Sequence, residues 1–153
     1  MHALIATDGS EVSIDAARKG VALLNPDKVT LLTVADTSIA DDSGAGGFEG
    51  NLLSPEESER ARDAILSEGS TELADTAAAL GLDKSVVDTK VVEGSSGQMI
   101  IHEADEADVD VIVVGSHGHG FISRVLIGSV SEYVVRHSTR PVLVLRHEDA
   151  AGD

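Results

Sequence analysis

Glycine and serine residues in the second half of the chain have the types and spacing needed to bind a phosphate group. Residues 115–120 read Gly-Ser-His-Gly-His-Gly, and Gly128, Ser129 and Ser131 follow further along. Glycines let a backbone approach a phosphate closely, and the N–H groups that open a following helix favour negative charge. No Lys follows these glycines, so the pattern is not a Walker A loop, whose Lys reaches the terminal phosphates. The spacing predicts an anion site built from main-chain groups, with ordinary turn chemistry as the alternative.

Titratable side chains accompany this pattern. Asp8 follows a short apolar run near the N-terminus, where it either hydrogen-bonds a ligand hydroxyl or stabilises a turn. His117 and His119 form an H-x-H pair, but two histidines without a third ligand are weak evidence for a metal site. Arg124 is either a phosphate ligand or a solvated loop residue. We therefore assign no catalytic residue and expect no dedicated protein metal site.

Short apolar runs alternate with helical patterns along the chain, and these elements must position the polar residues. The expected strands cover residues 4–7, 29–34, 86–92, 109–114 and 141–145. The expected helices cover residues 11–24, a stretch from a capping box at Ser54 to Gly81, a stretch that opens at Ser95 or Ser96, and residues 129–137. This alternation predicts a single doubly wound α/β domain, with a five-stranded parallel sheet and helices on both faces. For this sheet we expect the strand order 3-2-1-4-5.

The expected strand order places the first and fourth strands side by side, where the order reverses. Ligands of doubly wound sheets bind beyond the carboxyl ends of the strands at this point. Residues 7–10, Thr-Asp-Gly-Ser, follow the first strand, and the glycine-rich residues 115–120 follow the fourth. We expect both segments to face one crevice.

The remaining segments have less regular patterns. One domain is expected over residues 1–147, followed by an acidic C-terminal tail at residues 148–153. Residues 36–53 contain four glycines and little periodicity, which predicts a flexible internal loop. Acidic residues recur between Glu103 and Asp110, and we expect this run to form the solvated face of a helix.

Composition excludes several classes of function. The 153 residues, 42% of them apolar, are enough for one globular domain with a core. A net charge of -16 disfavours unaided binding to nucleic acid or to an anionic membrane, because both are polyanions. The absence of Cys excludes disulfides, thiolate metal sites and cysteine nucleophiles.

The N-terminal residues, the apolar runs and the charge composition also indicate where in the cell the protein is found. The N-terminal residues lack the basic and long apolar regions of a signal peptide, and the apolar runs are too short to span a bilayer. These features predict a cytoplasmic protein. Lysines are few and carboxylates are spread along the chain, which is typical of proteins from a high-salt cytoplasm, where salt screens the repulsion. An ordinary acidic protein is the alternative.

The glycine and serine spacing resembles the nucleotide-binding signature of the universal stress protein family. Gly115, two residues, Gly118, nine residues and then Gly128-Ser129 match the G-2x-G-9x-G-S motif of its ATP-binding subgroup. Residues 4–10, 32–36 and 140–145 are also similar to that family, so the resemblance covers essentially the whole chain. It implies an adenine-nucleotide-binding α/β domain that forms a homodimer through the strand at residues 141–145.

The resemblance also implies a role for each matching position. Ala6 and Thr7 would line the adenosine pocket, although many ATP-binding relatives have Pro in place of Ala6. Asp8 would accept hydrogen bonds from the ribose, and Val34 would meet adenine through its main chain. The phosphates would be surrounded by Gly115, Gly118, Gly128, Ser129, Val130 and Ser131. The implied ligand is ATP, with ADP or AMP as alternatives, and Mg²⁺ would bridge its phosphates.

Three functions follow from these observations. The first is a nucleotide-dependent regulatory or stress-response module that acts on a protein partner of unknown identity. It is favoured because the crevice has no evident catalytic base near the phosphates. The alternatives are a slow Mg²⁺-dependent ATPase, in which Asp8 and the two histidines would supply titratable groups, and a nucleotide-free dimeric scaffold.

Overall fold

Five parallel strands form one sheet in the order β3-β2-β1-β4-β5, which confirms the predicted fold class. The computed structural model describes residues 1–37, 53–116 and 127–146. The strands are β1 (His2–Ala6), β2 (Lys28–Ala35), β3 (Val87–Glu93), β4 (Val111–Gly115) and β5 (Val142–Leu145). These bounds differ from the predicted ones by at most two residues at either end.

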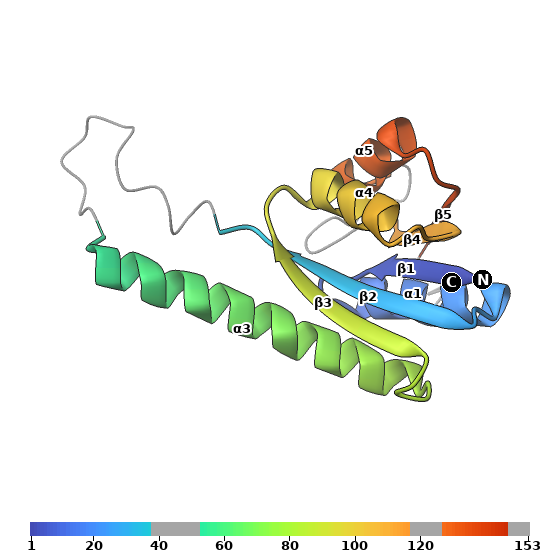
Figure 1. Cartoon of the computed structure of the whole chain (residues 1–153), viewed down its shortest axis with the longest axis horizontal. Coiled ribbons are helices and arrows are strands. Elements are labelled where there is room, and N and C mark those ends of the chain that lie inside the picture. The colour runs from blue at the N-terminus through green and yellow to red at the C-terminus, as the bar shows by residue number, and fades with distance from the viewer. Residues whose placement is uncertain (38–52, 117–126, 147–153) are drawn as a thin grey trace, which may run out of the picture.

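Helices cover both faces of the sheet (Figure 1). They are α1 (Glu11–Leu24), α3 (Pro55–Leu80), α4 (Ser96–Glu106) and α5 (Ser129–His137). Successive strand residues point to opposite faces, so Leu4 joins Ile100 of α4 and Val134 of α5 in one cluster, while Ile5 joins Leu73 of α3 in the other. Because both faces are packed, β4 is buried along four of its five residues and reads as a continuous apolar run.

Local capping chemistry sets the helix ends. Ser54 accepts a hydrogen bond from the N–H of Glu57, and the Glu57 carboxylate accepts one from the N–H of Ser54, which completes the predicted capping box of α3. Gly81 ends this helix in the left-handed conformation, with φ of 60°. Ser10 caps α1 by accepting from the N–H of Ser13.

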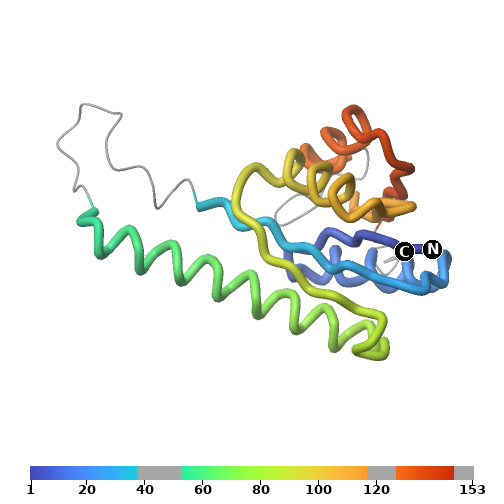
Figure 2. The backbone as a smooth tube through the Cα atoms, in the orientation of Figure 1, coloured from blue at the N-terminus to red at the C-terminus, as the bar shows by residue number. Residues whose placement is uncertain are grey.

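Helix α3 extends well beyond the sheet, as Figures 1 and 2 show. Its buried residues, Gly69, Leu73 and Thr76, all lie in its C-terminal half. Its N-terminal half is tied to the body by Arg62, whose guanidinium donates to both carboxylate oxygens of Glu93 at 3.0–3.2 Å. This ion pair joins the projecting half of α3 to the carboxyl end of β3.

The structure corrects the expectation for the acidic run. Glu103 is 8% exposed and pairs with Lys90 of β3, whereas Asp105, Glu106, Asp108 and Asp110 are exposed as expected. Glu103 lies three residues after Ile100 and one before Ala104, so the helical period turns it toward the sheet with these two apolar residues. The prediction was wrong for Glu103 because it considered only how often acidic residues recur, and not the helix face on which each one lies.

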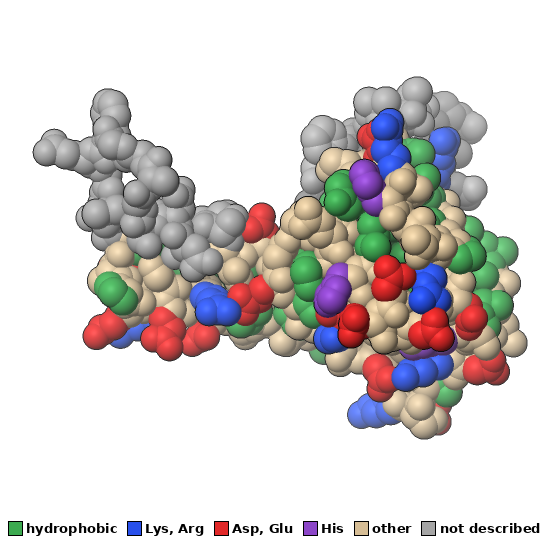
Figure 3. Space-filling model, turned by 45° about the horizontal axis from the view of Figure 1, so that its top comes forward, with side chains coloured by type: hydrophobic (Ala, Val, Ile, Leu, Met, Phe, Trp, Pro, Cys, Tyr) green, Lys and Arg blue, Asp and Glu red, His purple; other side chains and the backbone are tan. Residues whose placement is uncertain are grey.

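Acidic and basic side chains lie together on the visible surface. On the face in Figure 3, most Asp and Glu side chains lie over the left projection and the lower half of the body, with Lys, Arg and His among them. No helix in the described ranges has both the length and the apolarity needed to cross a membrane. The predicted tail at residues 148–153, most of the predicted loop at residues 36–53, and His117, Gly118, His119 and Arg124 lie outside the described residues.

Candidate functional site

A cavity of about 310 Å³ opens at the carboxyl ends of β1 and β4, where the strand order reverses. We call it the central cavity. Of the residues singled out from the sequence, it is lined by Ala6, Thr7, Asp8, Val34, Gly115, Gly128, Ser129, Val130 and Ser131. Gly118 lies outside the described residues. The fold therefore brings together segments that are more than a hundred residues apart in the sequence.

The first turn of α5 forms one wall of the central cavity. The Gly128 N–H donates to the Ser116 carbonyl at 2.5 Å, which holds the start of α5 against the end of β4. The Ser131 hydroxyl donates to the Gly128 carbonyl at 2.9 Å and is therefore engaged within the helix. The first-turn N–H groups have no acceptor inside their own helix, so this wall attracts an anion through main-chain groups.

A buried hydroxyl network fixes the turn after β1. The Thr7 hydroxyl lies 3.0 Å from that of Ser13 and 3.1 Å from that of Thr76, and it accepts from the Gly9 N–H at 3.1 Å. The Thr33 hydroxyl donates to the Thr7 carbonyl at 2.9 Å. These bonds satisfy buried polar groups of α1, α3 and β2 together. Thr7 lines the cavity, and its hydroxyl holds the cavity wall in place.

Asp8 sits on this turn and lines the central cavity. One carboxylate oxygen, Oδ1, accepts from the N–H of Ser10 at 3.1 Å and from its hydroxyl at 2.6 Å. This is the turn-stabilising role considered from the sequence, while the N-cap of α1 is Ser10. The contacts with Ser10 hold the Asp8 carboxylate on the cavity wall. A carboxylate has about four acceptor positions, which suits it to accept hydrogen bonds from more than one donor.

The rest of the cavity wall was not identified from the sequence. It consists of Ser13, Leu32, Ser96, Ile100 and Val114. Strand alternation could have indicated Leu32, which lies on the same face as Val34. No sequence signal indicates Ser96 or Ile100, because they reach the cavity only through the path that α4 takes over the sheet. Together with Val34, the three apolar residues Leu32, Ile100 and Val114 give the central cavity an apolar wall.

A second cavity of about 680 Å³ adjoins the central one. We call it the annex. The two cavities share Ser96, Ser129 and Val130, and the annex is further lined by Asp36, Thr37, Gly94, Ser95, Gly97 and Tyr133. The sequence did not predict this cavity. Its lining is hydroxyl-rich and includes one carboxylate, so it differs in chemistry from the apolar part of the central cavity.

The arrangement suits a ligand with three chemically different parts. The apolar wall suits a flat ring, the Asp8 carboxylate suits hydroxyl groups, and the first turn of α5 suits an anion. Among the residues that the structure describes, no three His, Asp or Glu side chains come together as metal ligands.

Comparison with known proteins adds the family context. A sequence model of the universal stress protein family matches residues 1–146. A putative universal stress protein of Staphylococcus saprophyticus, SSP1056, is 33% identical over 153 aligned residues, which cover 98% of this chain and 86% of that protein. The universal stress protein MJ0577 of Methanocaldococcus jannaschii is 37% identical over 60 residues, or 39% of this chain and 37% of that protein.

Solved structures have the same fold. The structure of MJ0577 matches this chain with a TM-score of 0.77 and 26% identity, covering 97% of both chains. The structure of a universal stress protein family protein from Arabidopsis thaliana with AMP bound matches with a TM-score of 0.58, covering 97% of this chain and 92% of that one. At 18% identity, the second likeness shows the fold alone.

Proposed function

This chain belongs to the universal stress protein family, and from that premise we propose that it binds ATP and acts as a nucleotide-dependent regulatory module of the stress response. The central cavity is the observation that carries the proposal. The residues matching the G-2x-G-9x-G-S signature within the described ranges, Gly115, Gly128 and Ser129, line the same cavity as Asp8 and Val34. This supports assigning the chain to the ATP-binding subgroup.

Each part of the nucleotide has a partner in this proposal. Adenine lies against the apolar wall that includes Val34 and Ile100, the ribose hydroxyls donate to Asp8, and the phosphates meet the first turn of α5. Mg²⁺ is held by the phosphates and water, since it keeps most of its waters when bound. ADP and AMP share the adenosine and the first phosphate, so they bind the same site. The AMP-bound Arabidopsis protein supports the proposal because its fold accommodates an adenine nucleotide.

The regulatory part of the proposal rests on a chain of contacts that leads away from the cavities. The Thr37 hydroxyl donates to Glu93 at 3.4 Å, and Glu93 pairs with Arg62 of α3. Thr37 is buried and lines the annex, whereas the projecting half of α3 is exposed. A ligand that shifts Thr37 therefore changes the contact that restrains α3, and a protein partner senses the position of this helix.

We also propose a homodimer through β5. This strand lies at the edge of the sheet, and its residues are half-buried in the single chain. An apolar edge strand exposes unpaired main-chain groups to which a second copy can add. Sedimentation velocity should give the mass of a dimer for the wild type and a monomer for Val144→Lys. A wild type that stays monomeric at all concentrations would contradict the dimer without affecting nucleotide binding.

Calorimetric titration of ATP, ADP, AMP and adenosine, with Mg²⁺ at molar salt, tests nucleotide binding. Ser129→Asp places a carboxylate where the phosphates are expected, yet Asp is a favourable residue in the first turn of a helix, so the fold should persist. We expect this variant to weaken ATP binding about 100-fold by charge repulsion and to leave adenosine binding unchanged.

The matched control is Ser129→Asn, which has nearly the same shape as the Asp variant without its charge. It should bind ATP within about threefold of the wild type, because the main-chain donors are retained. A folded wild-type chain that binds none of these ligands would contradict the proposal, and a nucleotide-free scaffold would remain as the alternative function.

A further inference from the structure

The annex is larger than the central cavity and shares part of its wall, so we treat it as a second compartment of the nucleotide site. Its volume of about 680 Å³ exceeds the 310 Å³ of the central cavity. Both volumes lie in the range of about 300–1,000 Å³ that is typical of small-molecule sites. Because Ser96, Ser129 and Val130 line both cavities, one ligand can occupy them together.

The annex lining indicates the charge of the group that it accepts. Asp36 lies on its wall, and Glu93 lies next to Thr37 and Gly94, which also line it. No Lys, Arg or His is among the described residues that line the annex. Because Glu93 is paired with Arg62, Asp36 is the carboxylate that sets the charge of this wall, and it disfavours the terminal phosphates of a nucleotide there. The annex suits a neutral group.

The hydrogen-bonding groups on the wall narrow the chemistry further. Thr37, Ser95, Ser96, Ser129 and Tyr133 all carry hydroxyls, which both donate and accept. A carboxylate at the end of a strand is a recurrent acceptor for the hydroxyls of ribose in doubly wound folds. Asp36 directly follows β2, just as Asp8 follows the end of β1. Each cavity therefore has one carboxylate beyond a strand end, with the first turn of α5 on their shared wall.

We infer that the annex binds a second sugar, so that the ligand class of this site is an ADP-sugar, with adenosine in the central cavity, the diphosphate along the shared wall and the sugar hydroxyls at Asp36. This inference rests on the proposed function, because it needs the adenosine in the central cavity. It extends that function by adding a contact that ATP, ADP and AMP cannot make.

ADP-ribose and ADP provide the decisive comparison, since they share the adenosine and the diphosphate and differ by one ribose. Titration calorimetry on the full chain should give an affinity for ADP-ribose about tenfold higher than that for ADP. Asp36→Asn should reduce this advantage to less than about twofold while changing ADP affinity much less, because only the sugar contact is weakened.

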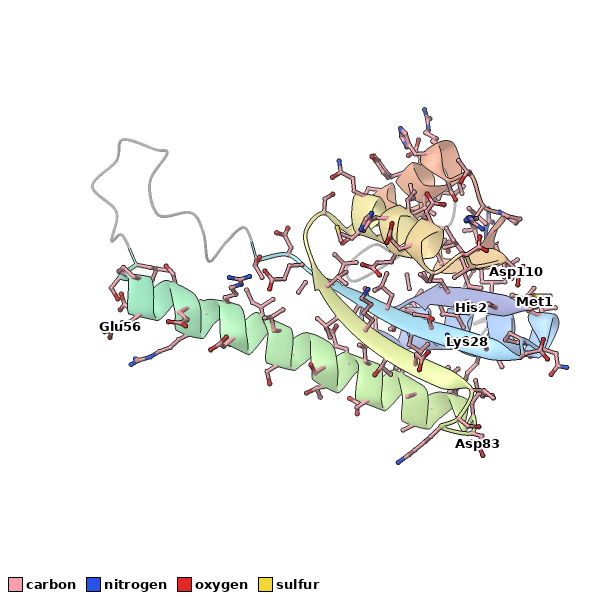
Figure 4. All side chains as sticks on the ribbon, viewed as in Figure 1. Met1, His2, Lys28, Glu56, Asp83 and Asp110 are labelled. Atoms are coloured by element: carbon pink, nitrogen blue, oxygen red, sulfur yellow. The ribbon has the colours of Figure 1, made fainter. Side chains whose placement is uncertain are left out.

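A second variant fills the annex. Ser95 is exposed at the start of α4, and its side chain makes no capping hydrogen bond, so Ser95→Phe leaves the helix cap intact. It should also remove the advantage of ADP-ribose and spare ADP binding. Asp83→Asn is the matched control for charge, because Asp83 is an exposed carboxylate in the turn before β3 (Figure 4), whereas the annex lies beyond the carboxyl end of that strand. It should keep the tenfold advantage.

The outcomes separate the two proposals. If the wild type binds ADP and ADP-ribose equally well, the ADP-sugar inference is wrong and the nucleotide site stands. If the advantage of ADP-ribose survives both Asp36→Asn and Ser95→Phe, the sugar lies elsewhere and the inference is again wrong. If the folded chain binds neither ligand, the proposed function fails and the inference fails with it.

Discussion

Glu103 and Lys90 form an ion pair between α4 and β3 in which one partner is buried and the other is half-exposed. The side chain of Glu103 is 11% exposed and that of Lys90 is 53% exposed. Removing Lys90 would leave a carboxylate that is largely out of water without its partner, which is costly. Because the Lys90 side chain is half-exposed, water can reach Glu103 when Lys90 is removed and replace part of the lost interaction.

We therefore expect Lys90→Ala to reduce the free energy of unfolding by about 1–2 kcal/mol in urea titrations. The matched control is Lys28→Ala. Lys28 pairs with Asp88 at 3.2 Å, but both side chains are more than half exposed, so its loss should cost less than about 0.5 kcal/mol. Equal losses in the two variants would contradict the role of burial.

His2 gives a prediction about pH. Its ring nitrogen Nε2 lies 2.9 Å from the Thr30 hydroxyl, and Figure 4 shows the residue near Lys28. Burial, followed by the nearby Lys28 charge, lowers the pKa of His2 from its ordinary value of 6.5. The unfolded chain therefore binds more protons than the native chain between the lowered pKa and pH 6.5.

The free energy of unfolding should accordingly rise with pH across this window and lose the His2 contribution as pH falls through it. Urea titrations at several pH values measure the slope. In His2→Gln this contribution disappears, since Gln can keep a hydrogen bond to Thr30 but does not titrate. A slope that is identical in the variant and the wild type would contradict the prediction.

At the scale of elements, the spacing between α4 and α5 depends on Gly97. A Cβ at this position would lie 2.5 Å from the Tyr133 Cδ1 atom and 3.1 Å from its Cβ, which is closer than packed atoms approach. The glycine therefore lets the Tyr133 ring pack against α4, and both residues line the annex. The shape of this cavity is set by how closely the two helices approach.

Gly97→Ala should destabilise the fold by about 1–3 kcal/mol, because the helices must separate or the ring must move. Thermal or urea unfolding measures the change. Gln98→Ala is the matched control: Gln98 is exposed at the next position of α4, and Ala should be neutral or slightly stabilising there. A Gly97→Ala variant as stable as the control would mean that the tight contact relaxes without cost.

At the scale of the whole molecule, charge is the dominant feature. With 27 acidic and 11 basic side chains, the folded chain holds a net charge of -16 in a compact volume, and this repulsion opposes folding. Salt shortens the screening length from about 10 Å at 0.1 M to about 3 Å at 1 M. The urea midpoint should therefore rise markedly as potassium chloride increases over this range. An unchanged midpoint would contradict the high-salt interpretation of the composition.

The sequence alone determined the type and order of the elements because these depend on neighbours in the chain. Hydrophobic period separates strands from helices, and capping residues such as Ser54 and Gly81 end a helix through contacts within a few residues. Parallel right-handed connections leave only a few strand orders open, and the expected order 3-2-1-4-5, which the structure confirms, brings Asp8, Gly115 and Ser129 to one edge of the sheet.

Only the tertiary structure decided which residues complete that edge. Ser96 and Ile100 line the central cavity, Glu103 is buried and the annex exists because α4 crosses the sheet along one path and packs closely against α5. That path results from side chains of several elements fitting together, through contacts between residues far apart in the sequence. Local periodicity carries no information about such contacts, which is why the sequence indicated one phosphate-binding crevice and the fold contains two adjoining cavities.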